Sequence, residues 1–211
     1  MAIRNVAAKG EKPRYALYFN NKYVEYIGDA KALARWRKKQ AGLELPHVAR
    51  NGGNNEWYTP QSYIESVRRV MKTIDTDPAS SDIANTLVKA SVYFTSKDDG
   101  RTKRWSGNIY LNPPYAQPLI SDFCRLLLRK WWDKEISQAC VLVNNATETS
   151  FYQDMLAACN AICFIKGRVK FVDENGREGA PLQGQTILYF GVNSTTFIEE
   201  FSRYGVCLHG N

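Results

Sequence analysis

A strand that runs directly into two consecutive prolines constrains the fold of this chain more than any other feature. Residues 108–111, Asn-Ile-Tyr-Leu, have the pattern of a buried strand, and Asn112-Pro113-Pro114-Tyr115 follows them. Proline has a fixed φ and no amide hydrogen, and it restricts the residue before it, so the strand must end here in a stiff loop. The pattern therefore predicts a rigid polar loop at the carboxyl end of a buried strand.

The rest of residues 51–211 alternates helical and strand patterns, which predicts an α/β domain. We expect helices over residues 60–71, 81–90, 119–132 and 150–159. We expect strands over residues 73–75, 108–111, 138–143 and 161–165. The last two strands are expected over 169–171 and 185–191, joined by a polar loop over 173–184.

Residues 1–50 predict a separate, basic ββα segment. Residues 14–27 have the pattern of a hairpin with a turn at Asn20-Asn21. Asp29 is a suitable N-cap for a helix that extends to about Gln40. The basic residues of that helix are Lys31, Arg35, Arg37, Lys38 and Lys39. This segment either lies on phosphates or is a packing appendage with a charged face, and residues 41–55 have the composition of a linker.

The net charge of +7 lies entirely in the first quarter of the chain. Residues 1–50 hold 11 Lys and Arg against 4 Asp and Glu, and the remaining residues hold 17 of each. Such an asymmetry favours contact with a polyanion, and nucleic acid is the preferred interpretation over a merely solvated surface.

Cysteine and histidine usage argues against a metal site or a disulfide framework. The five cysteines lack the short paired spacing of zinc or redox sites, and there are two histidines. No apolar stretch approaches the roughly 20 residues of a membrane helix, and the basic start of the chain lacks the apolar core of a secretion signal. We therefore expect an intracellular, cytoplasmic protein with no metal and no membrane partner.

The Asn-Pro-Pro-Tyr pattern suits methylation of a planar amine. The lone pair of such an amine is delocalised, so the group becomes nucleophilic when acceptors bind both of its N–H groups. The Asn112 side-chain oxygen and a backbone carbonyl, that of Pro113, are the candidate acceptors, held by the stiffness of Pro113 and Pro114. Tyr115 offers a flat face on which a flipped base can stack.

The chain resembles the phage and prophage family of DNA N6-adenine methyltransferases over residues 55–191. The matching segments are Asn55–Pro60, Ile74–Ser80, Ala84-Asn85, Asp98–Gly100, Trp105–Gly107, Asn112–Pro118, Val143–Thr147, Gly167–Phe171 and Pro181–Gln185. This resemblance implies a class I methyltransferase fold, which is Rossmann-like with a mostly parallel sheet and an antiparallel last strand. It also implies S-adenosylmethionine as cofactor and adenine in duplex DNA as substrate, in a bacterial or phage-infected cell.

The resemblance also implies a set of cofactor contacts near the ends of the first strands. Asp77 is a candidate partner for the positive methionine amine, and Thr59 for its carboxylate. Asn85 is a candidate for the ribose hydroxyls, and Asp98 or Asp99 for the adenine amine unless they form an acidic turn. The full set of expected cofactor residues is Trp57, Tyr58, Thr59, Pro60, Asp77, Pro78, Ala79, Ser80, Asn85, Asp98 and Asp99.

Phe171 and several basic residues are expected on the DNA side of the site. Phe171 either forms a wall opposite Tyr115 or belongs to the core. The expected phosphate contacts are Lys166, Arg168, Lys170, Arg101, Lys103, Arg104 and the N-terminal Arg35, Arg37, Lys38 and Lys39. No long insertion separates the proline loop from the last strand, which predicts short or relaxed sequence specificity.

Three other functions are compatible with the same motif. An RNA adenine or a glutamine amide in a protein presents a similar planar amine. The third alternative is an inactive methyltransferase fold that binds nucleic acid without catalysis. The intact Asn112–Tyr115 motif argues against the third alternative, and the basic N-terminal segment argues against the protein substrate.

Overall fold

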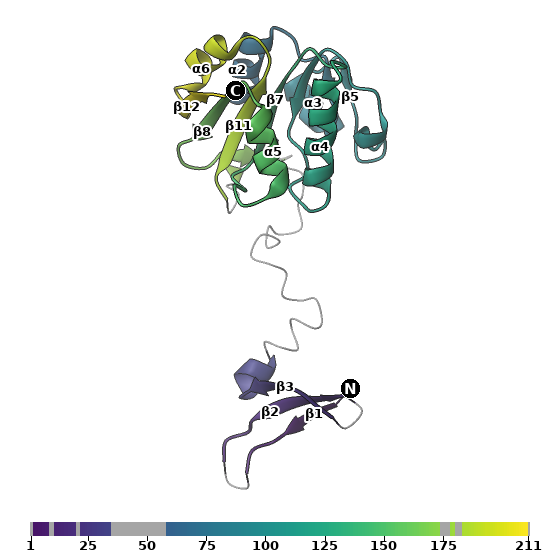
Figure 1. Cartoon of the computed structure of the whole chain (residues 1–211), viewed down its shortest axis with the longest axis vertical. Helices are drawn as coiled ribbons and strands as arrows, with labels where there is room; N and C mark the ends of the chain where they lie inside the picture. Colours follow the sequence, from purple (N-terminus) through teal and green to yellow (C-terminus); the bar gives the residue numbers. More distant parts are fainter. Residues whose placement is uncertain are drawn as a thin grey trace. The chain divides into compact units, whose positions relative to one another are not determined.

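The computed structural model describes residues 2–8, 11–19, 22–34, 58–173, 178–179 and 183–210. The chain divides into two compact units, Met1–Gly53 and Asn54–Asn211 (Figure 1).

The first unit contains a three-stranded antiparallel sheet. Its strands are β1 (Ala2–Asn5), β2 (Tyr15–Phe19) and β3 (Lys22–Gly28), in the order β1-β2-β3. The β2–β3 hairpin matches the sequence prediction, whereas β1 was missed because four residues are too short to show a pattern. Residues 30–34 are helical, and Asp29 accepts a hydrogen bond from the Ala32 N–H at 2.8 Å, as an N-cap should. Arg35, Arg37, Lys38 and Lys39 lie outside the described residues.

The second unit is built on a seven-stranded sheet in the order β12-β8-β11-β7-β6-β4-β5. Four strands run parallel: β5 (Val92–Tyr93), β4 (Thr76–Asp77), β6 (Asn108–Leu111) and β7 (Gln138–Asn144). Strand β11 (Gln185–Phe190) runs antiparallel between β7 and β8 (Ala161–Ile165). Strand β12 (Gly205–His209) pairs antiparallel with β8 at the edge. The carboxyl ends of the four parallel strands therefore share one edge of the sheet.

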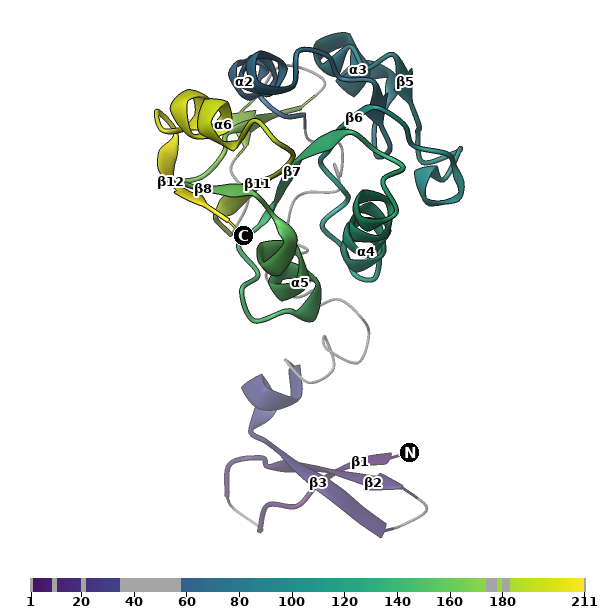
Figure 2. The ribbon, with the colours of Figure 1, turned by 45° about the horizontal axis from the view of Figure 1, so that its top comes forward.

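Helices cover both faces of this sheet (Figure 2). Helices α2 (Gln61–Met71), α3 (Asp82–Val88) and α6 (Ser194–Phe201) lie on one face. Helices α4 (Leu119–Trp132) and α5 (Ser150–Ala158) lie on the other. The result is a three-layer α/β arrangement that leaves the strand ends free to carry a site.

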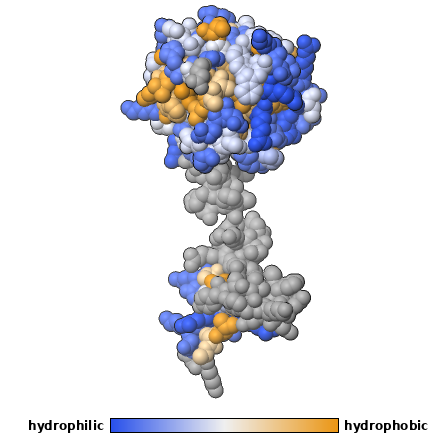
Figure 3. Space-filling view, viewed as in Figure 1, coloured by the Kyte–Doolittle hydropathy of each residue, from blue (hydrophilic) through white to orange (hydrophobic). Residues whose placement is uncertain are grey.

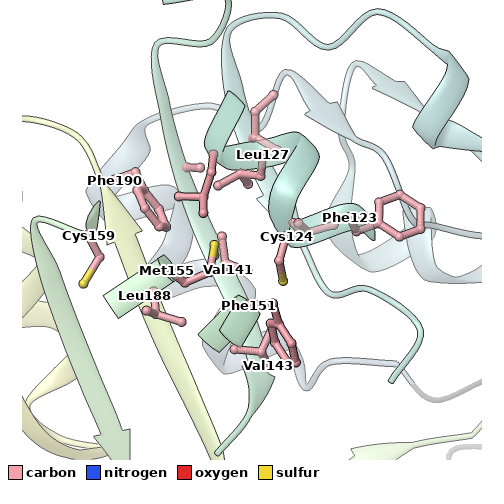
Figure 4. Close-up of a cluster of buried hydrophobic side chains, with 14 of the residues drawn as sticks. Phe123, Cys124, Leu127, Val141, Val143, Phe151, Met155, Cys159, Leu188 and Phe190 are labelled. Carbon is pink, nitrogen blue, oxygen red and sulfur yellow. The ribbon is translucent and has the colours of Figure 1, made fainter. Parts of the chain in front are cut away.

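Side chains that alternate along β7 and β11 build a separate core on each face. Val141, Val143 and Leu188 point toward α4 and α5, where they meet Cys124 and Phe151 (Figure 4). The intervening residues of these strands belong to the core beneath α2 and α6. Four of the five cysteines are buried, and all five are free. Burial raises the pKa of the Cys124 thiol to about 12, which fits a packing role.

Three strand predictions were wrong. The first parallel strand is Thr76–Asp77 and not residues 73–75, because the ladder to β6 forms at Thr76, paired with Ile109. The strand expected at 169–171 is β9 (Phe171–Val172), which pairs with β10 (Glu178–Gly179) in a separate two-stranded sheet. The strand expected last, over 185–191, is β11, and it is not the last strand, since α6 and the antiparallel β12 follow it.

Gly107 directly precedes β6, at a position where a side chain would collide with Asp75. It has φ +72°, and an added Cβ would lie 2.2 Å from Asp75 Oδ2, which accepts the Asn108 N–H at 2.8 Å. We expect Gly107→Ala to lower the free energy of unfolding, measured in urea, by about 2–4 kcal/mol, because strain and collision act together. The matched control is Gly167→Ala, with φ +82° and no atom within 4 Å of the added Cβ. Equal losses of unfolding free energy in the two variants would show that collision with Asp75 does not contribute to the effect at Gly107.

Candidate active site

The Asn-Pro-Pro-Tyr loop, residues 112–115, follows β6 at the carboxyl edge of the parallel strands. Asn112 Oδ1 is buried and accepts no hydrogen bond within the part of the chain that the structure describes. Buried acceptors are nearly always paired, so an unpaired one in a loop is expected to meet a ligand donor. The structure thus leaves the atom expected to bind an amine N–H available for it.

Tyr115, the last residue of the Asn-Pro-Pro-Tyr loop, forms an aromatic pair with Phe171. Their ring centroids are 6.3 Å apart with an interplanar angle of 77°, an edge-to-face contact. Phe171 is 3% exposed, so it is both part of the core and in contact with Tyr115. The Tyr115 hydroxyl is buried without a hydrogen-bond partner among the described residues, and burial raises its pKa far above the ordinary value. The raised pKa keeps the Tyr115 hydroxyl protonated near neutral pH.

Asp77 ends β4 as a buried carboxylate, 2% exposed. Its Oδ1 accepts the Ala79 N–H at 3.2 Å, and no cationic side chain of the described residues pairs with it. Burial raises its pKa to about 6, opposed by the nearby Ser80 hydroxyl and the Ala79 N–H. Ser80 Oγ itself makes no well-formed hydrogen bond. A buried anion without a counter-ion is suited to a cationic ligand.

The segment before α2 is attached to both β9 and β6. Tyr58 and Val172 exchange backbone hydrogen bonds of 2.8 and 3.0 Å. The Thr59 hydroxyl lies 2.6 Å from the Tyr110 hydroxyl, and both side chains are buried. Thr59 does not cap α2, since Pro60 is the N-cap residue and makes no side-chain cap bond. The Tyr110 hydroxyl also lies close enough to Asp77 for that carboxylate to raise its pKa, after the larger effect of burial.

Three other expected cofactor residues bond locally. The Asn85 side chain bonds both backbone groups of Ala90, at 2.8 and 3.4 Å, and so stabilises the end of α3. Asp98 Oδ2 accepts the Thr95 N–H at 2.9 Å, which is the acidic-turn alternative, and this lowers its pKa. Asp99 pairs with Arg101 Nε at 2.8 Å, and its pKa is lowered mainly by that bond. Pro78 and Ala79 lie directly after Asp77, and Trp57 lies outside the described residues.

The expected phosphate-contact residues that the structure describes fall into two groups. Lys166, Arg168 and Lys170 are exposed on the segment that precedes Phe171, and Lys170 pairs weakly with Glu178 at 3.1 Å. Arg101, Lys103 and Arg104 lie instead beside α4, where they line a hollow with Arg129 and Lys130. Arg101 is paired with Asp99 and Asp122.

Gln185 was not predicted as a site residue, yet it joins three of the matching segments. It is fully buried at the start of β11. Its Nε2 donates to Asn144 Oδ1 at 3.1 Å and to the Gln183 carbonyl at 2.7 Å, and its Oε1 accepts the Val169 N–H at 3.1 Å. In the sequence, a glutamine at the first position of a largely apolar strand is the signal that could have indicated this role. Gln185 therefore fixes the segment that carries Phe171 to the central sheet.

Replacing Gln185 by leucine is expected to destabilise the protein by about 2–4 kcal/mol. The substitution leaves the buried Val169 N–H and Asn144 Oδ1 without these partners, and each such group costs about 1–3 kcal/mol. Gln153→Leu is the matched control, because Gln153 is exposed and its side chain donates a hydrogen bond to the Thr147 carbonyl. For the control, urea unfolding should show that the free energy of unfolding falls by less than about 0.5 kcal/mol. Similar losses in both variants would refute the anchoring role.

No group of three or more His, Cys, Asp or Glu side chains among the described residues could hold a metal ion. No described helix is both long enough and apolar enough to span a bilayer.

Comparison with known proteins identifies the family of the chain. A search of curated proteins finds no match to the chain. A protein-family model described as DNA N-6-adenine-methyltransferase (Dam) matches residues 49–196. The match covers more than two thirds of the chain and includes the Asn-Pro-Pro-Tyr loop, Asp77 and Gln185. The chain therefore belongs to the DNA N-6-adenine-methyltransferase (Dam) family, which implies a DNA substrate and methylation of adenine at N6.

Proposed function

We propose that this protein transfers a methyl group from S-adenosylmethionine to the exocyclic amine of an adenine that is flipped out of DNA. The family supports DNA adenine-N6 methylation. The observation that carries the finer proposal is the buried, unpartnered Oδ1 of Asn112, at the loop where that amine would be bound.

Asn112 acts as an acceptor for one N–H of the amine, and the Pro113 carbonyl acts as the second acceptor. Holding both hydrogens draws the nitrogen lone pair out of the ring and toward the methyl donor. The loop is stiff and Pro113 is buried, so the acceptors are in place before the base arrives. After methyl transfer the nitrogen is positively charged and loses its extra proton to water, so no side chain with an unusual pKa is required as a base.

Tyr115 and Phe171 supply the aromatic wall of the base pocket. Tyr115 is half-buried and would offer its ring to a flipped adenine, while the buried Phe171 supports that ring through their edge-to-face contact. Gln185 supports this wall from behind through the Val169 N–H, two residues before Phe171.

The residues at the end of β4 fit S-adenosylmethionine. When bound, this cofactor supplies an electrophilic methyl group on a positively charged sulfur. The Asp77 carboxylate, buried and without a counter-ion among the described residues, would hold the cationic methionine end. Tyr58, Thr59 and Pro60, fixed to Tyr110 and Val172, would form the neighbouring wall. Asn85 and Asp99 are left out of this set, because their side chains already bond within the protein.

The strand order supports a class I methyltransferase fold. Strands β5, β4, β6 and β7 are parallel, and an antiparallel strand is inserted before β8; this arrangement favours a ligand site at the shared carboxyl edge of the parallel strands. DNA would approach this edge over Lys166, Arg168 and Lys170. We further expect the basic residues 1–50 to add salt-sensitive affinity, and the target sequence to be short or relaxed.

The direct test measures transfer of labelled methyl groups to four acceptors: duplex DNA, single-stranded DNA, RNA and a glutamine-containing protein. We expect DNA to be the preferred acceptor. Preference for RNA or for the protein would replace the proposed substrate. Absence of transfer to all four, together with binding to DNA, would identify an inactive binding module.

A further inference from the structure

A basic hollow beside α4 lies outside the residues assigned to the base and the cofactor. It has a volume of about 460 Å³ and is lined by Arg101, Thr102, Lys103, Arg104, Leu126, Arg129, Lys130 and Glu135. Five of these eight residues are cationic and one is acidic. The residues come from the segment after Asp99 and from the last two turns of α4, with Glu135 just beyond. Figure 3 shows hydrophilic side chains gathered on the α4 side of this unit.

Two of the five cations are already paired, and they shape the walls. Arg101 bonds Asp99 at 2.8 Å and Asp122 at 2.9 Å, which ties the 100–104 segment to the first turn of α4. Lys130 is 6% exposed, bonds Glu135 at 2.7 Å and lies 5.9 Å from the centroid of the Trp105 ring. These pairs hold the two sides of the hollow in a fixed geometry.

The other three cations are exposed toward solvent. Lys103, Arg104 and Arg129 form no ion pair with any described residue. Arg104 and Arg129 lie near enough to Glu135, and Lys103 to Asp98 and Asp99, to lower the pKa values of these carboxylates. Cations still outnumber carboxylates in the lining of this concave surface, so it attracts an anion, and guanidinium groups can bind a phosphate in a bidentate way. Arg129 belongs to a helix that showed no DNA-binding signal in the sequence, and only the fold brings it beside Lys103 and Arg104.

The position of the hollow relates it to the target base. Helix α4 begins four residues after Tyr115, and Arg129 is ten residues into it. At about 1.5 Å per residue, Arg129 lies on the order of 15 Å along the helix. Successive phosphates of one DNA strand are about 3.4 Å apart along the axis, so for a duplex that runs parallel to α4 this span corresponds to about four or five nucleotides.

We propose that Lys103, Arg104 and Arg129 bind the DNA phosphate backbone about four or five nucleotides from the methylated adenine. This inference rests on the proposed function and adds a second DNA contact to it, remote from the base pocket. The hollow fixes the position of the duplex and carries no sequence information.

The test compares Lys103→Gln/Arg129→Gln with the control Lys72→Gln/Lys89→Gln. The control removes the same charge from exposed residues at the ends of α2 and α3, on the opposite face of the sheet. Binding of the full chain to a long labelled duplex is measured over a series of salt concentrations. We expect the Kd of the hollow variant to rise about tenfold and its log–log salt slope to fall by about 2, with the control near wild type.

Three results would overturn the proposal. If wild type methylates DNA and the hollow variant keeps the wild-type salt slope, the hollow does not bind phosphate and the proposed function stands. If the salt slope of the control falls as much as that of the hollow variant, the change in net charge, and not a phosphate site in the hollow, explains the weaker DNA binding. If wild type neither binds nor methylates DNA, the proposed function fails and this inference fails with it. Thermal unfolding of each variant confirms that the exposed substitutions leave the fold intact.

Discussion

Replacing Asn112 by alanine is expected to lower kcat for methyl transfer by about 100- to 1000-fold, the range seen when one preorganised polar group is removed from a reacting centre. The alanine variant has no acceptor for the amine N–H, so the nitrogen lone pair stays delocalised in the ring. Asn112 Oδ1 has no partner among the described residues, so its removal breaks no internal hydrogen bond there. Cofactor affinity and thermal stability should therefore remain close to those of wild type.

Asn112→Asp is the matched variant for this prediction. Aspartate keeps an acceptor oxygen at the same position, and it should retain more activity than alanine. Rates are measured with saturating DNA and cofactor, and cofactor affinity is measured by calorimetry. A loss of cofactor affinity equal to the loss of rate would assign Asn112 to the cofactor, contrary to the proposed role.

Replacing Asp77 by asparagine is expected to remove cofactor binding and at the same time to stabilise the ligand-free protein. The pKa of Asp77 is about 6 in the fold against an ordinary value of 3.8, mainly because burial disfavours its charge. Between about pH 4 and pH 6, Asp77 therefore keeps its proton in the folded state but has lost it in the unfolded chain. The resulting penalty is absent below about pH 4, grows up to about pH 6, and reaches about 3 kcal/mol at pH 7.

Asparagine carries no charge and retains the Oδ1 acceptor for the Ala79 N–H. The difference in unfolding free energy between Asp77→Asn and wild type should rise from near zero at pH 4 to about 3 kcal/mol at pH 7. Urea unfolding over this pH range measures it. Asp154→Asn on the exposed face of α5 is the control and should change stability by less than about 0.5 kcal/mol throughout. A pH-independent difference, or unchanged cofactor affinity, would contradict the assignment.

These two residues represent what the sequence can predict well. Asn112 follows a buried strand and precedes two prolines, so local chemistry alone places it in a stiff loop. The bounds of α4 and β8 also agree with the sequence pattern, because their apolar periodicity is strong. Asp77 is in the expected motif, although the strand that it ends, β4, begins one residue after the predicted strand ended.

Other features depend on contacts between distant residues and have weak local signals. Helix α6 buries Phe197 and Phe201, spaced four residues apart, and that pattern was available but missed. Strand β12 is an edge strand whose Val206 and Leu208 are exposed, so it lacks a buried alternation. The anchoring by Gln185 and the meeting of Arg129 with Lys103 exist only once the sheet has formed.

The distinction between ligand contacts and local bonds is likewise decided by the fold. Asp98 and Asp99 satisfied the sequence criteria for a cofactor contact as well as those for an acidic turn. In the structure Asp98 closes the turn from Thr95, and Asp99 pairs with Arg101. Thr59 similarly has a buried tyrosine partner that lies 51 residues away in the sequence.

Nucleoside analysis of methylated DNA tests the central claim most directly. Unmethylated DNA is incubated with the full chain and labelled S-adenosylmethionine, digested, and separated into nucleosides. We predict label in N6-methyladenine with wild type and essentially none with Asn112→Ala. Label in another nucleoside, or equal N6-methyladenine from both proteins, would contradict the account of the Asn-Pro-Pro-Tyr loop as the amine-binding site.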